Sequence, residues 1–159
     1  MGVIRDVTRM AKMIDVGDKH VVKREATAQG SLVLKRSTVA AIASGTVKKG
    51  DVVTASKLAG IQAAKSTSTI LPLCHQIPLT SAEVEVRPEN ELLMCTCTVR
   101  AEHRTGVEME ALVGVTVALL NAWDMVKYLE KDESGQYPDA RITDIRVLNK
   151  RKGGWSDGS

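Results

Sequence analysis

Apolar and polar residues alternate along the chain with two different periods. A period near 3.6 residues, typical of a helix that buries one side, runs through residues 52–70 and 106–132. A period of 2, typical of a strand that buries one face, runs through residues 82–87 and, less regularly, 91–104. Together with shorter segments, these patterns predict a strand at 31–36, helices at 38–45 and 52–70, strands at 82–87 and 91–104, a helix at 106–132 and a strand at 141–150. This order predicts an α+β sandwich with helices on one face of a mostly antiparallel sheet.

The predicted elements leave the two ends of the chain without a clear period. Residues 1–30 are charged throughout, and we expect an extended segment that becomes ordered only where it packs. Residues 150–159 are basic and then glycine-rich, and we expect a flexible tail. Ser37 is a candidate N-cap for the first helix, which Gly45 can end. The length of 159 residues fits a single domain covering residues 1–159.

The composition narrows the class of protein. The chain is 43% hydrophobic but only 3% aromatic and has no Phe, so small and aliphatic side chains must fill its core. The net charge of +3, from 22 basic and 19 acidic residues, is too balanced for a protein that coats a nucleic acid. Three cysteines, an odd number, fit a reducing compartment better than a disulfide scaffold. With no signal peptide and no membrane-length apolar run, we expect a cytoplasmic protein without a membrane partner.

The sequence "ILPLCHQIPL" places a thiol and an imidazole side by side between prolines. Pro72 and Pro78 disfavour a helix interior and a central strand, so Cys74 and His75 should lie on a rigid, extended connection. Cys74 by itself is more typical of packing than of nucleophilic chemistry, because cysteine behaves as a small buried hydrophobe. The choice between packing and chemistry depends on the rest of the chain.

A metal site and a P-loop are not expected. The further candidate ligands Cys95, Cys97 and His103 have no C-x-x-C spacing. The two cysteines are two positions apart on a predicted strand and therefore face one side, where core packing is their expected role. No G-x-x-x-x-G-K-[ST] motif is present. We expect neither a metal nor a cofactor.

The longest predicted helix carries polar residues among apolar ones. Glu110 and Asp124 are 14 residues apart, close to four turns, so they share a side of the helix but lie about 21 Å apart along its axis. Asp124 and Lys127 form either a surface ion pair or a couple for proton transfer. If Glu110 and Asp124 are both functional, either the ligand is long or the site is shared between subunits. In a shared site, we expect Lys49, which lies on a different element, to meet Asp124 across the subunit interface. Arg24 is a further cation that could converge on phosphates.

Four stretches together resemble one family. They are "MIDVGDKHVVKREATAQG", "KKGDVVTASKLAGIQAAKSTSTILPLCHQIPLTSAEVEV", "TGVEMEALVGVTVALLNAWDMVKYLEKD" and "ITDIRVLNKRKGG". The motifs "GIQAAK", "PLCH" and "TGVEMEAL" occur in the order and at the spacings of the cyclic pyranopterin monophosphate synthase family, also called the MoaC family. The resemblance runs from about residue 13 to residue 154.

The resemblance implies a single catalytic domain with a ferredoxin-like fold, assembled as a hexamer of three dimers with interfacial active sites. The implied reaction converts 3′,8-cyclo-7,8-dihydro-GTP into cyclic pyranopterin monophosphate with release of pyrophosphate, in molybdenum cofactor biosynthesis. The implied catalytic residues are Asp124, Lys127 and Lys49. The implied substrate-binding residues are Leu73, Cys74, His75, Glu108, Met109, Glu110 and Arg24, with a lysine of the tail.

The tail departs from the family pattern. "NKRKGGWSDG" has one extra residue before the glycines and Trp155 where a lysine is usual, so Lys150 and Lys152 both remain candidates for the tail lysine. Two other functions stay open from the residues alone. One is a nucleotide-binding module without catalysis, and the other is a nucleic-acid-binding protein that uses the basic tail.

Overall fold

The computed structural model describes residues 11–154, which form a four-stranded sheet covered by helices. The elements are β1 (Val22–Val33), α1 (Arg36–Ser44), α2 (Val52–Lys65), α3 (Thr67–Ile70), β2 (Ser81–Glu89), β3 (Leu92–His103), α4 (Glu108–Glu130) and β4 (Arg141–Lys152). The strand order is β2-β3-β1-β4, and all three neighbouring pairs are antiparallel. Two βαβ-like halves with this order make the ferredoxin-like arrangement, so the predicted fold class is confirmed.

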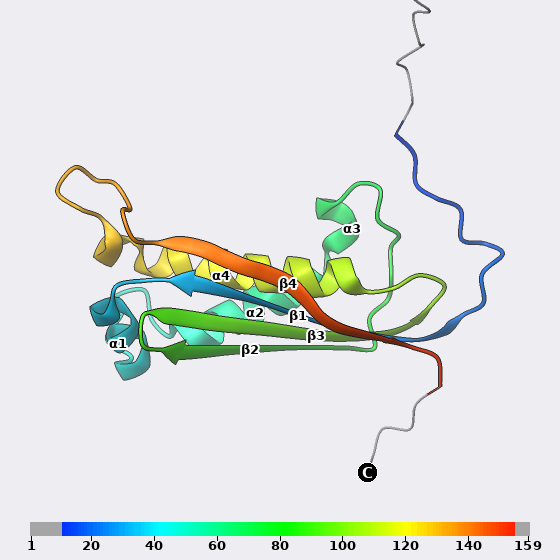
Figure 1. The fold of residues 1–159 in the computed structure, drawn as a ribbon, viewed down its shortest axis with the longest axis horizontal. Helices are drawn as coiled ribbons and strands as arrows, with labels where there is room; N and C mark the ends of the chain where they lie inside the picture. The colour runs from blue at the N-terminus through cyan, green and yellow to red at the C-terminus, as the bar shows by residue number, and fades with distance from the viewer. Residues whose placement is uncertain (1–10, 155–159) are drawn as a thin grey trace, which may run out of the picture.

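The two faces of the sheet differ in polarity. On one face Ala28 and Leu32 of β1 and Cys95 and Cys97 of β3 are fully buried beneath the helices. Figure 1 shows α4 and α2 running along this side of the strands. The opposite face is polar; the hydroxyls of Thr27 and Thr98, for example, are 2.9 Å apart. The prediction that Cys95 and Cys97 serve packing is confirmed by their burial.

Two glycines let α2 and α4 approach each other and the sheet. A Cβ on Gly60 would lie 2.9 Å from the carbonyl oxygen of Gly114, and a Cβ on Gly114 would lie 2.6 Å from Sγ of Cys97. Both distances are shorter than carbon side chains tolerate. The absence of side chains at these positions therefore sets the depth at which α4 packs.

The first strand differs most from the sequence prediction. It begins at Val22 rather than Ser31, because residues 22–30, expected as part of an extended segment that becomes ordered only where it packs, pair with both β3 and β4. Its inward positions include Ala26 and Gly30, where a Cβ on the glycine would lie 2.8 Å from Val115. Side chains from α4 fill the space that large residues would otherwise occupy, so this central strand lacks the usual apolar signal.

Smaller differences concern the ends of other elements. The N-cap of α1 is Lys35 rather than Ser37, whereas Gly45 ends α1 with φ 69° as expected. The predicted second helix is interrupted at Ser66, which separates α2 from α3. The strand β4 continues to Lys152, so the first residues of the predicted flexible tail are in the sheet. Residues 155–159 of that tail, and residues 1–10, lie outside the described part of the chain.

Helix α4 meets a length and hydropathy criterion for crossing a membrane, with a mean hydropathy of 1.4 over its most apolar window. The sequence had predicted no such run. Half of that window is buried inside the protein, where α4 packs on the sheet. Burial of this kind is what the central helix of a soluble protein shows.

Candidate active site

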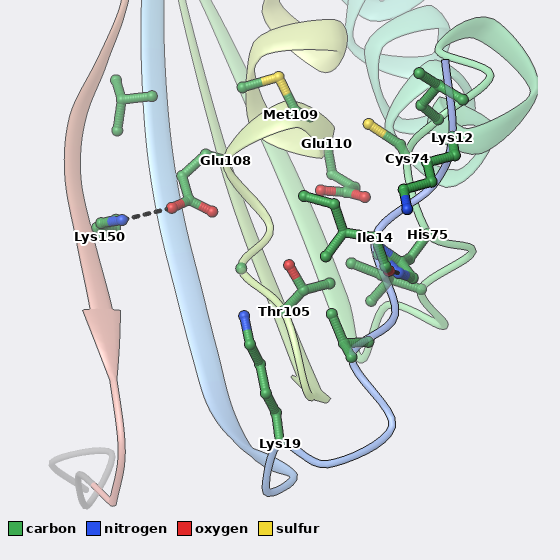
Figure 2. A pocket seen from close by; sticks show the side chains of 15 residues that line it. Lys12, Ile14, Lys19, Cys74, His75, Thr105, Glu108, Met109, Glu110 and Lys150 are labelled. Atoms are coloured by element: carbon green, nitrogen blue, oxygen red, sulfur yellow. Dashed lines mark hydrogen bonds and ion pairs between the residues drawn. The ribbon is translucent and has the colours of Figure 1, made fainter. Parts of the chain in front are cut away.

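The main pocket, of about 740 Å³, lies where α4 begins. Three other segments surround it: the connection 71–80, the end of β4, and residues 12–19, which precede β1. Figure 2 shows Lys150 on one side of this space and Cys74, His75 and Lys12 on the other, with the start of α4 between them. Segments far apart in the sequence thus build one pocket.

Two glutamates of the first turn of α4 face this pocket in different states. Glu110 is only 3% exposed, and burial raises the pKa of its carboxyl above the ordinary value, with the charge of Glu108 adding to the effect. Burial also raises the pKa of Glu108, but the hydrogen bond from Lys150, a backbone hydrogen bond and the charges of Lys150 and Arg24 together outweigh burial and hold that pKa below the ordinary value. The Nζ of Lys150 lies 2.8 Å from Oε1 of Glu108. The pocket therefore pairs an ionised carboxylate with one that is easier to protonate.

The thiol of Cys74 is half-buried in the same pocket. Burial raises its pKa above the ordinary value, and the nearby charge of Glu110 raises it further. A thiol with a raised pKa is protonated at neutral pH and is a poor nucleophile. The environment of Cys74 therefore favours a binding contact over covalent chemistry.

The neighbouring imidazole is held by the segment that precedes β1. Nε2 of His75 lies 2.6 Å from the carbonyl oxygen of Ile14. Because a carbonyl oxygen only accepts hydrogen bonds, Nε2 carries the proton in this contact. In the neutral ring, Nδ1 is then the nitrogen available as an acceptor.

Exposed apolar and cationic side chains complete this region. Leu73 and Met109 line the pocket with exposed fractions of 47% and 42%. A smaller adjoining pocket of about 370 Å³ is lined by Arg24, Lys150 and Lys152 among others. Arg24 donates hydrogen bonds to the carbonyl oxygens of His103 (3.3 Å) and Arg104 (3.0 Å), which fixes its guanidinium beside this second space. Lys150 lines both pockets and Lys152 only the smaller one.

A second polar cluster lies near the other end of α4. Nζ of Lys49 lies 2.8 Å from one carboxylate oxygen of Asp124, and Nζ of Lys127 lies 2.9 Å from the other. Hydrogen bonds from Lys127 and Lys49 lower the pKa of Asp124 to about 2. The same contact raises the pKa of Lys127. The cluster is thus one fixed negative charge held between two ammonium groups on the surface.

The position of Lys49 corrects one prediction. We expected Lys49 and Asp124 to meet across a subunit interface, but they contact each other within one chain. The loop between α1 and α2 folds back onto α4 and brings the two together. The predicted distance between Asp124 and Glu110 agrees with the structure, because both residues lie on one continuous helix, about 21 Å apart along its axis.

The twelve predicted site residues therefore fall into two groups. Nine of them gather around the start of α4, and three form the cluster of Lys49, Asp124 and Lys127. Sequence reasoning missed several residues that line the main pocket: Lys12, Ile14, Val16, Lys19, Ile77, Thr105, Gly106 and Val147. The first four belong to a segment without periodicity; the family resemblance, which begins at about residue 13, covers the last three of them but assigned them no role. Among residues 11–154, no three His, Cys, Asp or Glu side chains are grouped to hold a metal ion.

The fold and the charged residues that line its pockets define a class of protein, an α+β protein with a site suited to a small charged molecule. The profile of the MoaC family matches residues 13–153, and the chain belongs to this family. The resemblance inferred from the motifs is thereby confirmed.

Named relatives cover nearly the whole chain. A probable cyclic pyranopterin monophosphate synthase of Thermococcus kodakarensis is 51% identical over 154 residues, which is 94% of this chain and 99% of the relative. One of Sulfolobus acidocaldarius is 52% identical over 140 residues, covering 88% and 98%. A protein of Methanothermobacter thermautotrophicus, named a probable cyclic pyranopterin monophosphate synthase accessory protein, is 48% identical over 141 residues, covering 89% of each chain.

Proposed function

We propose that the chain is a cyclic pyranopterin monophosphate synthase, a lyase of molybdenum cofactor biosynthesis. It converts 3′,8-cyclo-7,8-dihydro-GTP into cyclic pyranopterin monophosphate and releases pyrophosphate. The observation that carries the proposal is family membership over residues 13–153, together with relatives of that name at about half identity. The two clusters supply the chemistry that such a reaction needs, namely recognition of a polar ring, phosphate binding and proton transfer.

The main pocket is the proposed site for the purine-derived ring. Glu110 and His75 offer hydrogen-bonding groups, while Leu73, Cys74 and Met109 offer apolar surface to a planar ligand. The mixture of a mostly apolar lining and a few polar groups is typical of small-molecule sites. In this arrangement the prolines flanking Cys74 and His75 fix the backbone that presents them.

The neighbouring cations are the proposed phosphate site. Arg24, Lys150 and Lys152 border the smaller pocket, which shares Glu108 with the larger one. We assign the role of the tail lysine to Lys150, because its ammonium reaches Glu108 and lines both spaces. A substrate seated with its ring near Glu110 would place its phosphates toward these side chains.

Lys49 and Lys127 are the proposed electrostatic and general-acid groups. Closing a cyclic phosphate while pyrophosphate leaves develops negative charge on phosphoryl oxygens, and fixed ammonium groups stabilise that charge. Asp124, with a pKa of about 2, is too weak a base to remove protons efficiently at neutral pH. Its proposed role is therefore to orient the two lysines.

The active site is proposed to be shared between subunits. The lysine cluster is too far from the main pocket along α4 for both to act on one bond within a chain, so a second chain would bring its cluster to this pocket. Such a site needs at least a dimer, and the proposed assembly is a hexamer of three dimers in the cytoplasm. No nucleic acid, metal or cofactor takes part in the proposed reaction.

Pyrophosphate release from the cyclised substrate tests the function directly. We expect turnover by the wild-type protein and, for Asp124→Asn, a kcat lower by about a hundredfold or more with fold and assembly unchanged. The matched control is Glu85→Gln, which neutralises a carboxylate that is also paired with a lysine, Lys57, but lies on the sheet. This control should retain wild-type kcat. Tight nucleotide binding without any pyrophosphate release would favour a non-catalytic nucleotide-binding module instead.

A further inference from the structure

The turn that carries Lys49 is fixed at several points. Val47 is buried at 5% exposure, and the amide of Gly50 donates to its carbonyl oxygen at 3.0 Å. Gly50 has φ 104°, a conformation that favours glycine. Asp51 then begins α2 by accepting a hydrogen bond from the amide of Thr54 at 3.0 Å. These contacts fix the conformation of the turn itself. Its attachment to α4 depends on other contacts.

Tyr128 joins this turn to α4. Its hydroxyl accepts a hydrogen bond of 2.9 Å from the backbone amide of Lys48, the residue before Lys49. The ammonium of Lys48 also lies 5.4 Å from the centre of the Tyr128 ring. Tyr128 follows Asp124 by four residues, so both project from the same side of α4. Helix α4 thus supplies Asp124, which pairs with the Lys49 ammonium, and Tyr128, which accepts a hydrogen bond from the Lys48 amide.

We infer that Tyr128 is a positioning residue for the reaction, because it fixes the backbone from which Lys49 reaches Asp124. The ammonium of Lys49 contacts both the carboxylate (2.8 Å) and the carbonyl oxygen (3.1 Å) of Asp124. A lysine side chain has four rotatable bonds, and an anchored backbone reduces the volume its ammonium explores. The inference rests on the proposed role of Lys49 in turnover.

Anchoring of this kind acts on the chemical step more than on binding. Electrostatic stabilisation of a transition state depends on donors held in place before charge develops, so a looser ammonium lowers kcat. Tyr128 does not touch the main pocket, and the affinity for the ring portion of the substrate should not depend on it. A purely structural tyrosine would change stability without a specific link to Lys49.

The test compares Tyr128→Phe, Lys49→Ala and the double variant in the pyrophosphate-release assay. Tyr128→Phe keeps the ring and removes only the acceptor, and we expect kcat to fall about tenfold with KM changed less than about twofold. In the Lys49→Ala background the same change should have no further effect on residual turnover. Hydrogen exchange of the Lys48 amide should become about tenfold faster in Tyr128→Phe.

Two matched variants isolate the hydrogen bond. Lys48→Ala removes the ammonium above the ring but keeps the amide donor, and Ser44→Ala removes a nearby exposed hydroxyl. Both should keep kcat within about twofold of wild type. If Tyr128→Phe unfolds, its circular dichroism shows it, and the backbone ester that replaces the Lys48 amide then tests the same bond from the donor side with the same expected loss.

The outcomes separate the inference from the proposed function. Wild-type kcat in Tyr128→Phe, with kcat strongly reduced in Lys49→Ala, would overturn the inference and leave the role of Lys49 intact. A further tenfold loss on adding Tyr128→Phe to Lys49→Ala would show that Tyr128 acts independently of Lys49, and would also overturn it. Wild-type kcat in Lys49→Ala itself would overturn the proposed role of the lysine and the inference with it.

Discussion

The side chains of Cys74 and His75 are adjacent in sequence but have different environments. The thiol has a raised pKa because of burial and Glu110, whereas the imidazole is hydrogen-bonded to the backbone of Ile14. We predict that Cys74→Ser keeps kcat within about threefold of wild type, since no thiolate is needed. His75→Ala should raise KM or lower kcat by about tenfold or more, because it removes a polar group of the pocket. Steady-state kinetics of pyrophosphate release measures both, and complete loss of turnover in Cys74→Ser would indicate thiol chemistry.

Glu25 illustrates a residue whose role is structural. Its carboxylate is 6% exposed and accepts hydrogen bonds of 2.6 Å from Arg100 and 2.8 Å from Arg151, which joins β1 to both of its neighbours. Burial raises its pKa, but the hydrogen bonds and charges of the two arginines together outweigh burial and lower the pKa below the ordinary 4.5. The stabilisation is therefore fully present above about pH 4.5 and is lost as the pH falls through the lowered value.

We predict that Glu25→Gln lowers the free energy of unfolding by about 1–3 kcal/mol at pH 7, because it removes the buried charge that pairs with Arg100 and Arg151. The difference from wild type should shrink at pH 3, and urea unfolding at both pH values measures it. Glu85→Gln is the control, since its pair with Lys57 is half-exposed and should contribute about 0.5 kcal/mol or less. Equal destabilisation at the two pH values would contradict an ionic origin.

At the scale of whole elements, the packing of α4 depends on Gly114. Alanine favours a helix interior over glycine by about 1 kcal/mol, so Gly114→Ala would stabilise an isolated helix. Here the added Cβ would lie 2.6 Å from Sγ of Cys97 and 3.3 Å from the carbonyl oxygen of Gly60. We predict a net loss of about 1–2 kcal/mol in the free energy of unfolding, measured by urea denaturation. Cys97→Ala in the same protein should recover part of that loss, because it removes the closest atom, and simple additivity of the two changes would contradict this cause.

The same close packing explains which elements the sequence could predict. The helix α4 and the strand β2 have clear periods and β3 a less regular one, and the predicted bounds of all three differ from the observed ones by at most two residues. The start of β1 was missed because small residues such as Ala26 and Gly30 occupy its inward positions beneath α4. Period alone could not distinguish Lys150 from Lys152, since residues two apart face the same side of a strand. The tertiary fold decides this: Lys150 lies opposite Ala26 of β1 and Lys152 opposite Arg24, and it is Lys150 that reaches Glu108.

At the scale of the whole molecule, α4 separates the two halves of the candidate site. Within one chain, the geometry groups Lys49 with Lys127 and Asp124, whereas His75 and Glu110 belong to the main pocket. The family motifs could indicate all of these residues, but contacts within a chain depend on the tertiary fold. Nothing in the sequence of the turn that carries Lys49 indicated that this turn contacts α4 of the same chain.

This grouping predicts which impaired chains can complement each other. In mixed oligomers, a His75→Ala chain and a Lys127→Ala chain should together restore activity, because one of the two shared sites in each hybrid dimer then has an intact pocket and an intact lysine cluster. Random mixing makes about half of the dimers hybrid, so about a quarter of the wild-type activity is expected.

Lys49→Ala mixed with Lys127→Ala should restore no activity, since both residues belong to the same cluster and every site in a hybrid lacks one of the lysines. Coexpression with two affinity tags verifies that hybrids form, and pyrophosphate release measures their activity. Restoration by the second pair, or none by the first in verified hybrids, would contradict a site built from the pocket of one chain and the lysine cluster of another.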